Sequence, residues 1–151
     1  AGEAVQKNGV SLAMAAEFEA VAQEQNLELD GGESQLLAML IQRKLRLLLT
    51  GDKRAIVAIE RIAGDTLPGP SIACLEQVMS TLLERIGLAA LRERICSEPA
   101  VDRALSTCFA CRSIVVEAIL VEEGLRSYVG HLRKSSSRTL LEEDDLSVLT
   151  S

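Results

Sequence analysis

The stretch LEQVMSTLLERI, residues 75–86, carries the clearest structural signal in this chain of 151 residues. Its apolar side chains recur at helical spacing, at Leu75, Val78, Met79, Leu82, Leu83 and Ile86. That spacing places them along one face of an α-helix and leaves polar side chains on the other face. Ser71, which follows Pro68-Gly69-Pro70, is expected to cap the helix, and Gly87 is expected to interrupt it. The stretch therefore predicts an amphipathic helix packed on an apolar core.

The same spacing recurs on both sides of this stretch. Helices are predicted over residues 11–25, 34–50, 53–63, 88–95 and 100–123, with a short last helix around 125–132. Residues 36–49 are apolar on more than one side, so their helix is expected to be central. Residues 100–123 contain neither Gly nor Pro, which predicts one long helix. No run alternates between apolar and polar residues, so no β-sheet is predicted.

These patterns predict an all-α fold. The expected architecture is a single irregular helical bundle, or a short HEAT- or armadillo-like stack, of about six to seven helices. The helical domain is expected to span residues 11–134. A flexible arm is predicted over residues 1–10 and a mobile acidic tail over residues 135–151.

Composition excludes several classes of protein. Hydrophobic residues make up 48% of the chain, which is long enough to form a core, so a disordered chain is excluded. Aromatic residues make up only 2%, which excludes a single-strand binder that stacks bases on aromatic rings. No apolar run approaches the ~20 residues that cross a bilayer, so no membrane span and no membrane partner are predicted.

Four cysteines, Cys74, Cys96, Cys108 and Cys111, fall within or next to helical patterns. They are interpreted as reduced, mostly buried thiols, and no secretory signal pattern opens the sequence. Cytoplasmic or nuclear localisation is therefore expected. Cys108 and Cys111 have the spacing of a redox or zinc pair, but the other candidate ligands lack a recognised spacing. Core packing is the favoured interpretation, and no metal or cofactor is expected.

The sequence shows no recognisable reaction centre. His131 is the only histidine, and no flanking motif pairs it with a nucleophile. Neither GxGxxG nor GxxxxGK[ST] occurs, and no Glu-x-x-His pair is present for a di-iron bundle. We therefore predict that the protein is not an enzyme and has no catalytic residues.

The leading functional hypothesis is a protein–protein interaction or scaffold module. An apolar groove between helices is expected to bind a partner segment or a second copy of the chain. The expected binding residues lie on the central helix and on the predicted long helix: Leu36, Leu40, Leu47, Leu105, Val115 and Ile119.

The alternative hypothesis rests on a basic segment in an otherwise acidic chain. The chain has a net charge of −6, yet one segment is basic, with Arg43, Lys44, Arg46, Lys53 and Arg54. Such a segment is either a solvated face or a contact to nucleic-acid backbone in an oligomeric viral or phage-type structural protein. In the predicted tail, Ser136 and Thr139 match short kinase-site patterns and are candidate phosphorylation sites.

Overall fold

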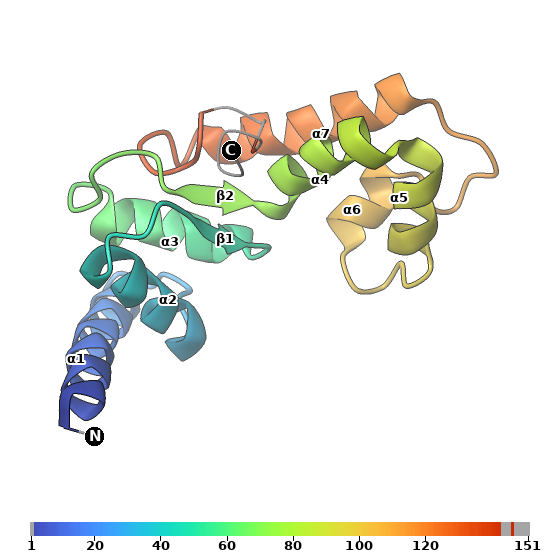
Figure 1. Ribbon diagram of the computed structural model, residues 1–151. Helices are drawn as coiled ribbons and strands as arrows, with labels where there is room; N and C mark the ends of the chain where they lie inside the picture. The colour runs from blue at the N-terminus through green and yellow to red at the C-terminus, as the bar shows by residue number, and fades with distance from the viewer. Residues whose placement is uncertain (1, 143–145, 147–151) are drawn as a thin grey trace. The chain divides into compact units, whose positions relative to one another are not determined.

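The computed structural model describes residues 2–142 and 146, with the backbone alone for residues 2–11 (Figure 1). Most of these residues are helical, which supports the predicted all-α class. The chain divides into two compact units. Unit 1 consists of Ala1–Cys74 and Lys134–Glu142, and unit 2 consists of Leu75–Arg133 and Glu143–Ser151. In the described part of the chain, no helix has both the length and the apolar character needed to cross a bilayer.

Unit 1 contains three helices and two short strands among its described residues. In chain order they are α1 (Gly2–Glu24), α2 (Gly31–Gln42), β1 (Leu48–Thr50), α3 (Lys53–Ala63) and β2 (Ile72–Cys74). Helix α1 packs against α2 and α3, and α3 packs against both strands. Because α1 begins at Gly2, residues 2–10, which were expected to form a flexible arm, are helical.

The two strands form a parallel sheet, so the prediction of no sheet is wrong. Leu48 pairs with Ile72, Leu49 with Ala73 and Thr50 with Cys74, and α3 forms the crossover between them. Each strand is three residues long, too short to show an alternating pattern. All three residues of β2 are buried, as in parallel strands covered on both faces, so the strand resembles any other apolar run.

The predicted helix over residues 34–50 is also shorter than expected. Asp30 caps α2 through its side chain, and the helix ends at Gln42. Lys44 then adopts a left-handed conformation with φ of 51°, and the Leu45 N–H donates to the Leu40 carbonyl at 3.0 Å. This is the hydrogen-bond pattern of a helix C-terminus that usually contains glycine. Because lysine occupies the position, no glycine marked the end in the sequence.

Unit 2 contains four helices among its described residues. They are α4 (Leu75–Ile86), α5 (Leu88–Cys96), α6 (Arg103–Cys108) and α7 (Ala118–Arg133). The helix predicted over residues 75–86 is confirmed, although Ser71 precedes β2 instead of capping this helix. Helix α4 packs against α5 and α7, and α6 packs against the same two helices.

The single long helix predicted over residues 100–123 is wrong. Helix α6 ends at Cys108, and α7 begins only at Ala118. Ala110 is left-handed with φ of 49°, and the Cys111 N–H donates to the Ser106 carbonyl at 3.1 Å. This repeats the helix ending seen after α2, again without glycine.

The early end of α6 changes the state of two cysteines. Cys111 leaves the helix and forms a disulfide with Cys96, the last residue of α5. The prediction of four reduced thiols is therefore wrong for this pair. Cys74 and Cys108 form no disulfide within the described residues and are buried, as predicted.

The first part of the predicted mobile tail is packed into unit 1. The N–H groups of Ser71 and Ile72 each donate to the Thr139 carbonyl at 2.9 Å, and the Leu141 N–H donates to the Ile72 carbonyl at 2.7 Å. Leu140 forms a parallel bridge with Ile72 and is fully buried. The tail from residue 143 on, except Leu146, lies outside the described residues.

Candidate functional site

An exposed apolar segment runs from the loop after α6 into the first turn of α7 in unit 2. Four aliphatic side chains are strongly exposed there: Ile114 at 95%, Val115 at 80%, Leu120 at 57% and Ile119 at 51%. We call residues 114–120 the 114–120 apolar stretch. Val116, in its middle, packs against the buried core of unit 2 and anchors the segment. Exposed apolar side chains gathered in one short segment often mark an interaction site.

The loop that precedes this stretch is held by one side chain of α5. Arg92 donates from Nε to the Phe109 carbonyl at 2.9 Å and from Nη2 to the Ala110 carbonyl at 2.8 Å. It also donates to the carbonyls of Ser113 and Ile114. The Cys96–Cys111 disulfide adds a covalent tie to the same helix. The loop therefore has a defined shape.

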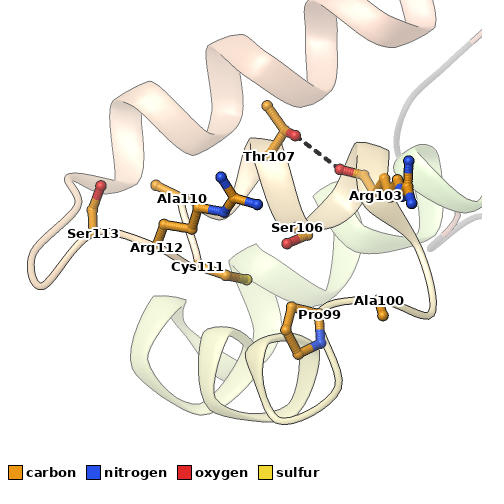
Figure 2. Close-up of a pocket in the computed structure, with 9 residues that line it drawn as sticks. All are labelled: Pro99, Ala100, Arg103, Ser106, Thr107, Ala110, Cys111, Arg112 and Ser113. Atoms are coloured by element: carbon orange, nitrogen blue, oxygen red, sulfur yellow. Dashed lines mark hydrogen bonds between the residues drawn. The ribbon is translucent and has the colours of Figure 1, made fainter.

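A pocket of about 780 Å³ lies beside this loop, between the start and the end of α6 (Figure 2). We call it the arginine pocket, because Arg103 and Arg112 are the charged residues among its described lining. Its nine described lining residues include no carboxylate, and three of them carry hydroxyl groups: Ser106, Thr107 and Ser113. The Thr107 hydroxyl donates to the Arg103 carbonyl at 2.8 Å, whereas the hydroxyls of the two serines make no such bond to another described residue.

Unit 1 contains a smaller pocket of opposite charge. It measures about 380 Å³ and is lined by Leu27, Glu28, Leu29, Asp30, Glu33 and Asp52. We call it the acidic pocket. Asp30 and Glu33 form a reciprocal capping box at the start of α2, and Asp52 caps α3. The acidic pocket therefore forms where the N-termini of two helices meet.

Proximity of these carboxylates alters the titration of one of them. Burial raises the pKa of Glu33, and the negative charges of Asp52 and Asp30 raise this pKa further, against the hydrogen bond from the Asp30 N–H. Glu28 is paired with Arg54 at 2.9 Å, so one of the four carboxylates has a cationic partner. The acidic pocket attracts cations, but among the described residues no three such groups are arranged to hold a metal ion.

The predicted basic residues do not form one surface of free cations. Arg43, Lys44 and Arg46 are exposed on the loop after α2, where we call them the basic loop. Arg54 is exposed but bound to Glu28, and Lys53 is half-buried with interactions of its own. Within this predicted set, the cations that lack an ion-pair partner among the described residues are those of the basic loop.

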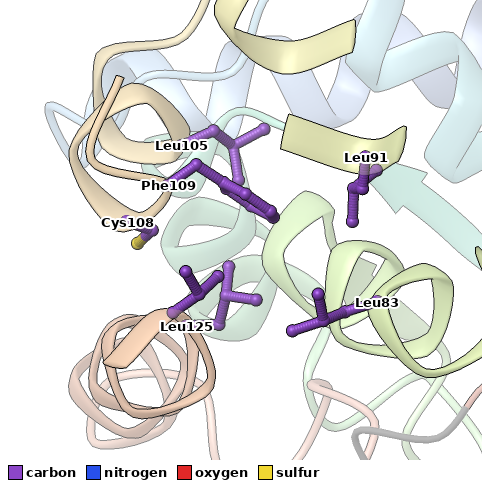
Figure 3. Close-up of a cluster of buried hydrophobic side chains, with 7 residues drawn as sticks. Leu83, Leu91, Leu105, Cys108, Phe109 and Leu125 are labelled. Atoms are coloured by element: carbon purple, nitrogen blue, oxygen red, sulfur yellow. The ribbon is translucent and has the colours of Figure 1, made fainter. Parts of the chain in front are cut away.

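The predicted partner-binding residues fall into three groups. Leu40 and Leu105 are buried in the interiors of units 1 and 2, so neither can touch a partner in this structure. Figure 3 shows Leu105 among the buried side chains of unit 2, together with Cys108 and Phe109. Leu36 is exposed and Leu47 is half-buried in unit 1. The remaining two, Val115 and Ile119, belong to the 114–120 apolar stretch.

The candidate phosphorylation sites are both fully buried. Ser136 and Thr139 have no exposed surface, and the Thr139 hydroxyl donates to the Glu60 carboxylate at 3.1 Å. A kinase could reach either hydroxyl only after residues 134–142 detach from the rest of unit 1. His131, the only histidine, is exposed in the last turn of α7.

Comparison with known proteins found no matching family model, no matching curated protein and no matching solved structure. The candidate sites therefore rest on the geometry of the chain alone.

Sequence reasoning missed the two pockets. A capping-box signature, an acid followed by Glu three residues later, is visible at Asp30 and Glu33 and could have located the start of α2. The approach of Asp52 to this box depends on how α3 packs. For the arginine pocket no sequence signal exists, because Arg103 and Arg112 come together only when the predicted long helix breaks.

Proposed function

We propose that this chain is a non-enzymatic interaction module that binds a protein partner through the 114–120 apolar stretch. The observation that carries the proposal is the exposure of Ile114, Val115, Ile119 and Leu120 in so short a segment. Removing such side chains from water contributes roughly 25 cal/mol per Å² of apolar surface to association. The tie of the preceding loop to Arg92 reduces the conformational entropy lost on binding.

The charges around the stretch favour a protein partner over a lipid surface. Glu117 and Glu123 are exposed within and just beyond it. An anionic membrane surface would repel these carboxylates. A protein segment that presents apolar side chains beside basic ones would complement both features. Such a segment belongs either to a different protein or to a second copy of the chain.

Site-specific photo-crosslinking tests this proposal. A photoreactive residue at position 115 should form an adduct with the partner, and one at Arg126, an exposed position on α7, should not. Ile114→Asp and Ile119→Asp should suppress the adduct from position 115. Light scattering then distinguishes a second copy from a different protein. Equal adducts from positions 115 and 126 would reject the proposal.

A second candidate function is contact with nucleic-acid backbone through the basic loop. It is favoured by the three exposed cations Arg43, Lys44 and Arg46, which have no carboxylate partner in the described structure. Arg43→Glu with Arg46→Glu should abolish salt-sensitive binding, whereas Arg61→Glu, an exposed control on α3, should weaken it far less. Light scattering also tests the oligomer that a viral or phage-type structural role requires.

The acidic pocket extends this second test. Nucleic acid incubated with the protein and Mg²⁺ or Mn²⁺ should remain intact if the basic loop only binds it. Cation-dependent cleavage that disappears in Asp52→Asn would instead assign hydrolysis to unit 1, because bound divalent cations activate water for attack on phosphodiesters. The same experiment therefore checks the proposal that the chain is not an enzyme.

Cytoplasmic or nuclear localisation stays a prediction from the sequence. The Cys96–Cys111 disulfide argues against it, because disulfides persist mainly in oxidising compartments. A count of reactive thiols in the unreduced protein tests whether this disulfide forms.

A further inference from the structure

We propose that the arginine pocket binds a phosphate-class anion, either free phosphate or a phosphomonoester group. This site is separate from the 114–120 apolar stretch and does not depend on the proposed function. Its charge is the first argument. Arg103 and Arg112 line the pocket without any carboxylate among the nine lining residues, and neither guanidinium has an ion-pair partner in the described structure. Two unpaired cations beside one hollow form a local positive field.

The donors of the pocket fit an oxyanion. Figure 2 shows the Arg112 side chain extending from the loop toward α6 and Ser106, with Arg103 at the start of the same helix. Each guanidinium presents a planar fork of N–H donors that matches two oxygens of a phosphate. The hydroxyls of Ser106 and Ser113 have no hydrogen-bond partner within the described chain and can donate as well. The pocket has no aromatic lining on which a nucleobase could stack, so recognition is of the anion.

The segment that carries Arg112 is held in place before any ligand binds. The disulfide fixes Cys111, the residue before Arg112, to the end of α5. Arg92 holds the carbonyls of Ala110 and Ser113 on both sides of it. The only left-handed residue of this segment is Ala110, so the turn depends on these ties. A fixed backbone reduces the entropy that an anion must offset on binding.

Phosphate titration of the full-length protein tests the proposal. Inorganic phosphate should produce saturable amide chemical-shift changes confined to residues 99–113, and sulfate should compete for the same signals. Arg103→Gln and Arg112→Gln should each weaken binding by about tenfold or more, the effect of losing a charge-assisted hydrogen bond. The Lys variants, which keep the charge but lose the fork, should bind with intermediate affinity.

Matched controls separate a specific site from general attraction. Arg94→Gln and Arg126→Gln remove exposed arginines of α5 and α7 that do not line the pocket, and both should bind phosphate like the wild type. Phosphoserine that binds more tightly than inorganic phosphate would identify a phosphorylated side chain as the source of the anion. Two results would overturn the proposal: no saturable change in the wild type, or an equal loss of affinity in Arg94→Gln. Circular dichroism confirms that each variant is folded.

Discussion

The Glu60 carboxylate accepts a hydrogen bond from Arg138 Nε at 2.7 Å, between residues 78 positions apart in the sequence. The backbone N–H groups of Arg138 and Thr139 donate to the same carboxylate at 2.8 and 3.0 Å. Arg138 also pairs with Asp65. Because Glu60 lies in α3, these bonds fasten the segment after α7 to the middle of unit 1. These bonds explain why residues 136–141 pack against α3.

Loss of the Glu60 charge should destabilise unit 1. The side chain is only 9% exposed, so water cannot replace its partners. We expect Glu60→Gln to lower the free energy of unfolding by about 2 kcal/mol, as is typical of hydrogen bonds to a charged group. Urea denaturation measures this change. Glu28→Gln is the matched control, because its pair with Arg54 is solvent-exposed on both sides and should contribute far less.

The same carboxylate should make stability depend on pH. Burial raises the pKa of Glu60, but the hydrogen bonds from Arg138 and Thr139 outweigh it and hold this pKa below its ordinary value of 4.5. A depressed pKa contributes stability above pH 4.5 that disappears as the pH falls through the folded-state value. The difference in free energy of unfolding between the wild type and Glu60→Gln should therefore become smaller in acid. A gap that is constant with pH would show that Glu60 is not held ionised.

Glu33 should behave in the opposite sense. Its pKa is raised above 4.5, so its protonated form is favoured in the folded state. The resulting stability is present below pH 4.5 and is lost as the pH rises through the folded-state value. At neutral pH, Glu33→Gln should raise the free energy of unfolding by about 0.5 kcal/mol, because it removes a charge that burial and the neighbouring Asp52 and Asp30 disfavour, an effect that solvent partly screens. Urea denaturation at neutral pH shows whether the free energy of unfolding rises, with Glu84→Gln on α4 as the control.

One leucine and one valine of unit 2 should respond differently to truncation, because one is buried and the other is exposed. Leu105 is buried against α7, so Leu105→Ala should lower the free energy of unfolding by roughly 2–5 kcal/mol. Val115 is exposed, so Val115→Ala should change it by less than about 0.5 kcal/mol. Thermal and urea denaturation measure both. Comparable losses at the two positions would mean that the 114–120 apolar stretch is covered within the chain.

Thiol reactivity should reveal the disulfide. Under denaturing conditions without reductant, two thiols should react, Cys74 and Cys108, and all four cysteines should react after reduction. Cys96→Ser should lower the free energy of unfolding by about 3 kcal/mol, the value expected for a short cross-linked loop. Denaturation of this variant, beside a wild type kept oxidised, measures the loss. Four reactive thiols in the unreduced protein purified without reductant would contradict the pairing.

Gly64 should be sensitive to a single added methyl group. A Cβ at this position would overlap the Glu60 carbonyl oxygen and the Arg138 guanidinium. Gly64→Ala should therefore loosen the contact between α3 and residues 136–141 and lower the melting temperature. Hydrogen exchange at Thr139 and Leu141 should accelerate in this variant. Unchanged protection of these amides would show that Arg138 moves aside without loss.

The sequence by itself determined the elements that depend on local chemistry. The apolar spacing of residues 75–86 defined α4, and Asp52 marked the start of α3. The helix predicted over residues 88–95 matches α5 closely. Each is set by side chains within one or two turns of one another, so periodicity and capping predict it. The all-α class follows from the same local patterns.

Only the tertiary structure decided where helices α2 and α6 end, which cysteines pair and what covers β2. Lys44 and Ala110 adopt left-handed conformations that no local rule assigns to lysine or alanine. The strands pair, and Arg138 reaches Glu60, across long stretches of chain, so their stability depends on contacts that no local window contains. Both pockets also depend on the tertiary structure. Asp52 joins the acidic pocket through the packing of α3, and Arg103 and Arg112 line one pocket because the predicted long helix breaks.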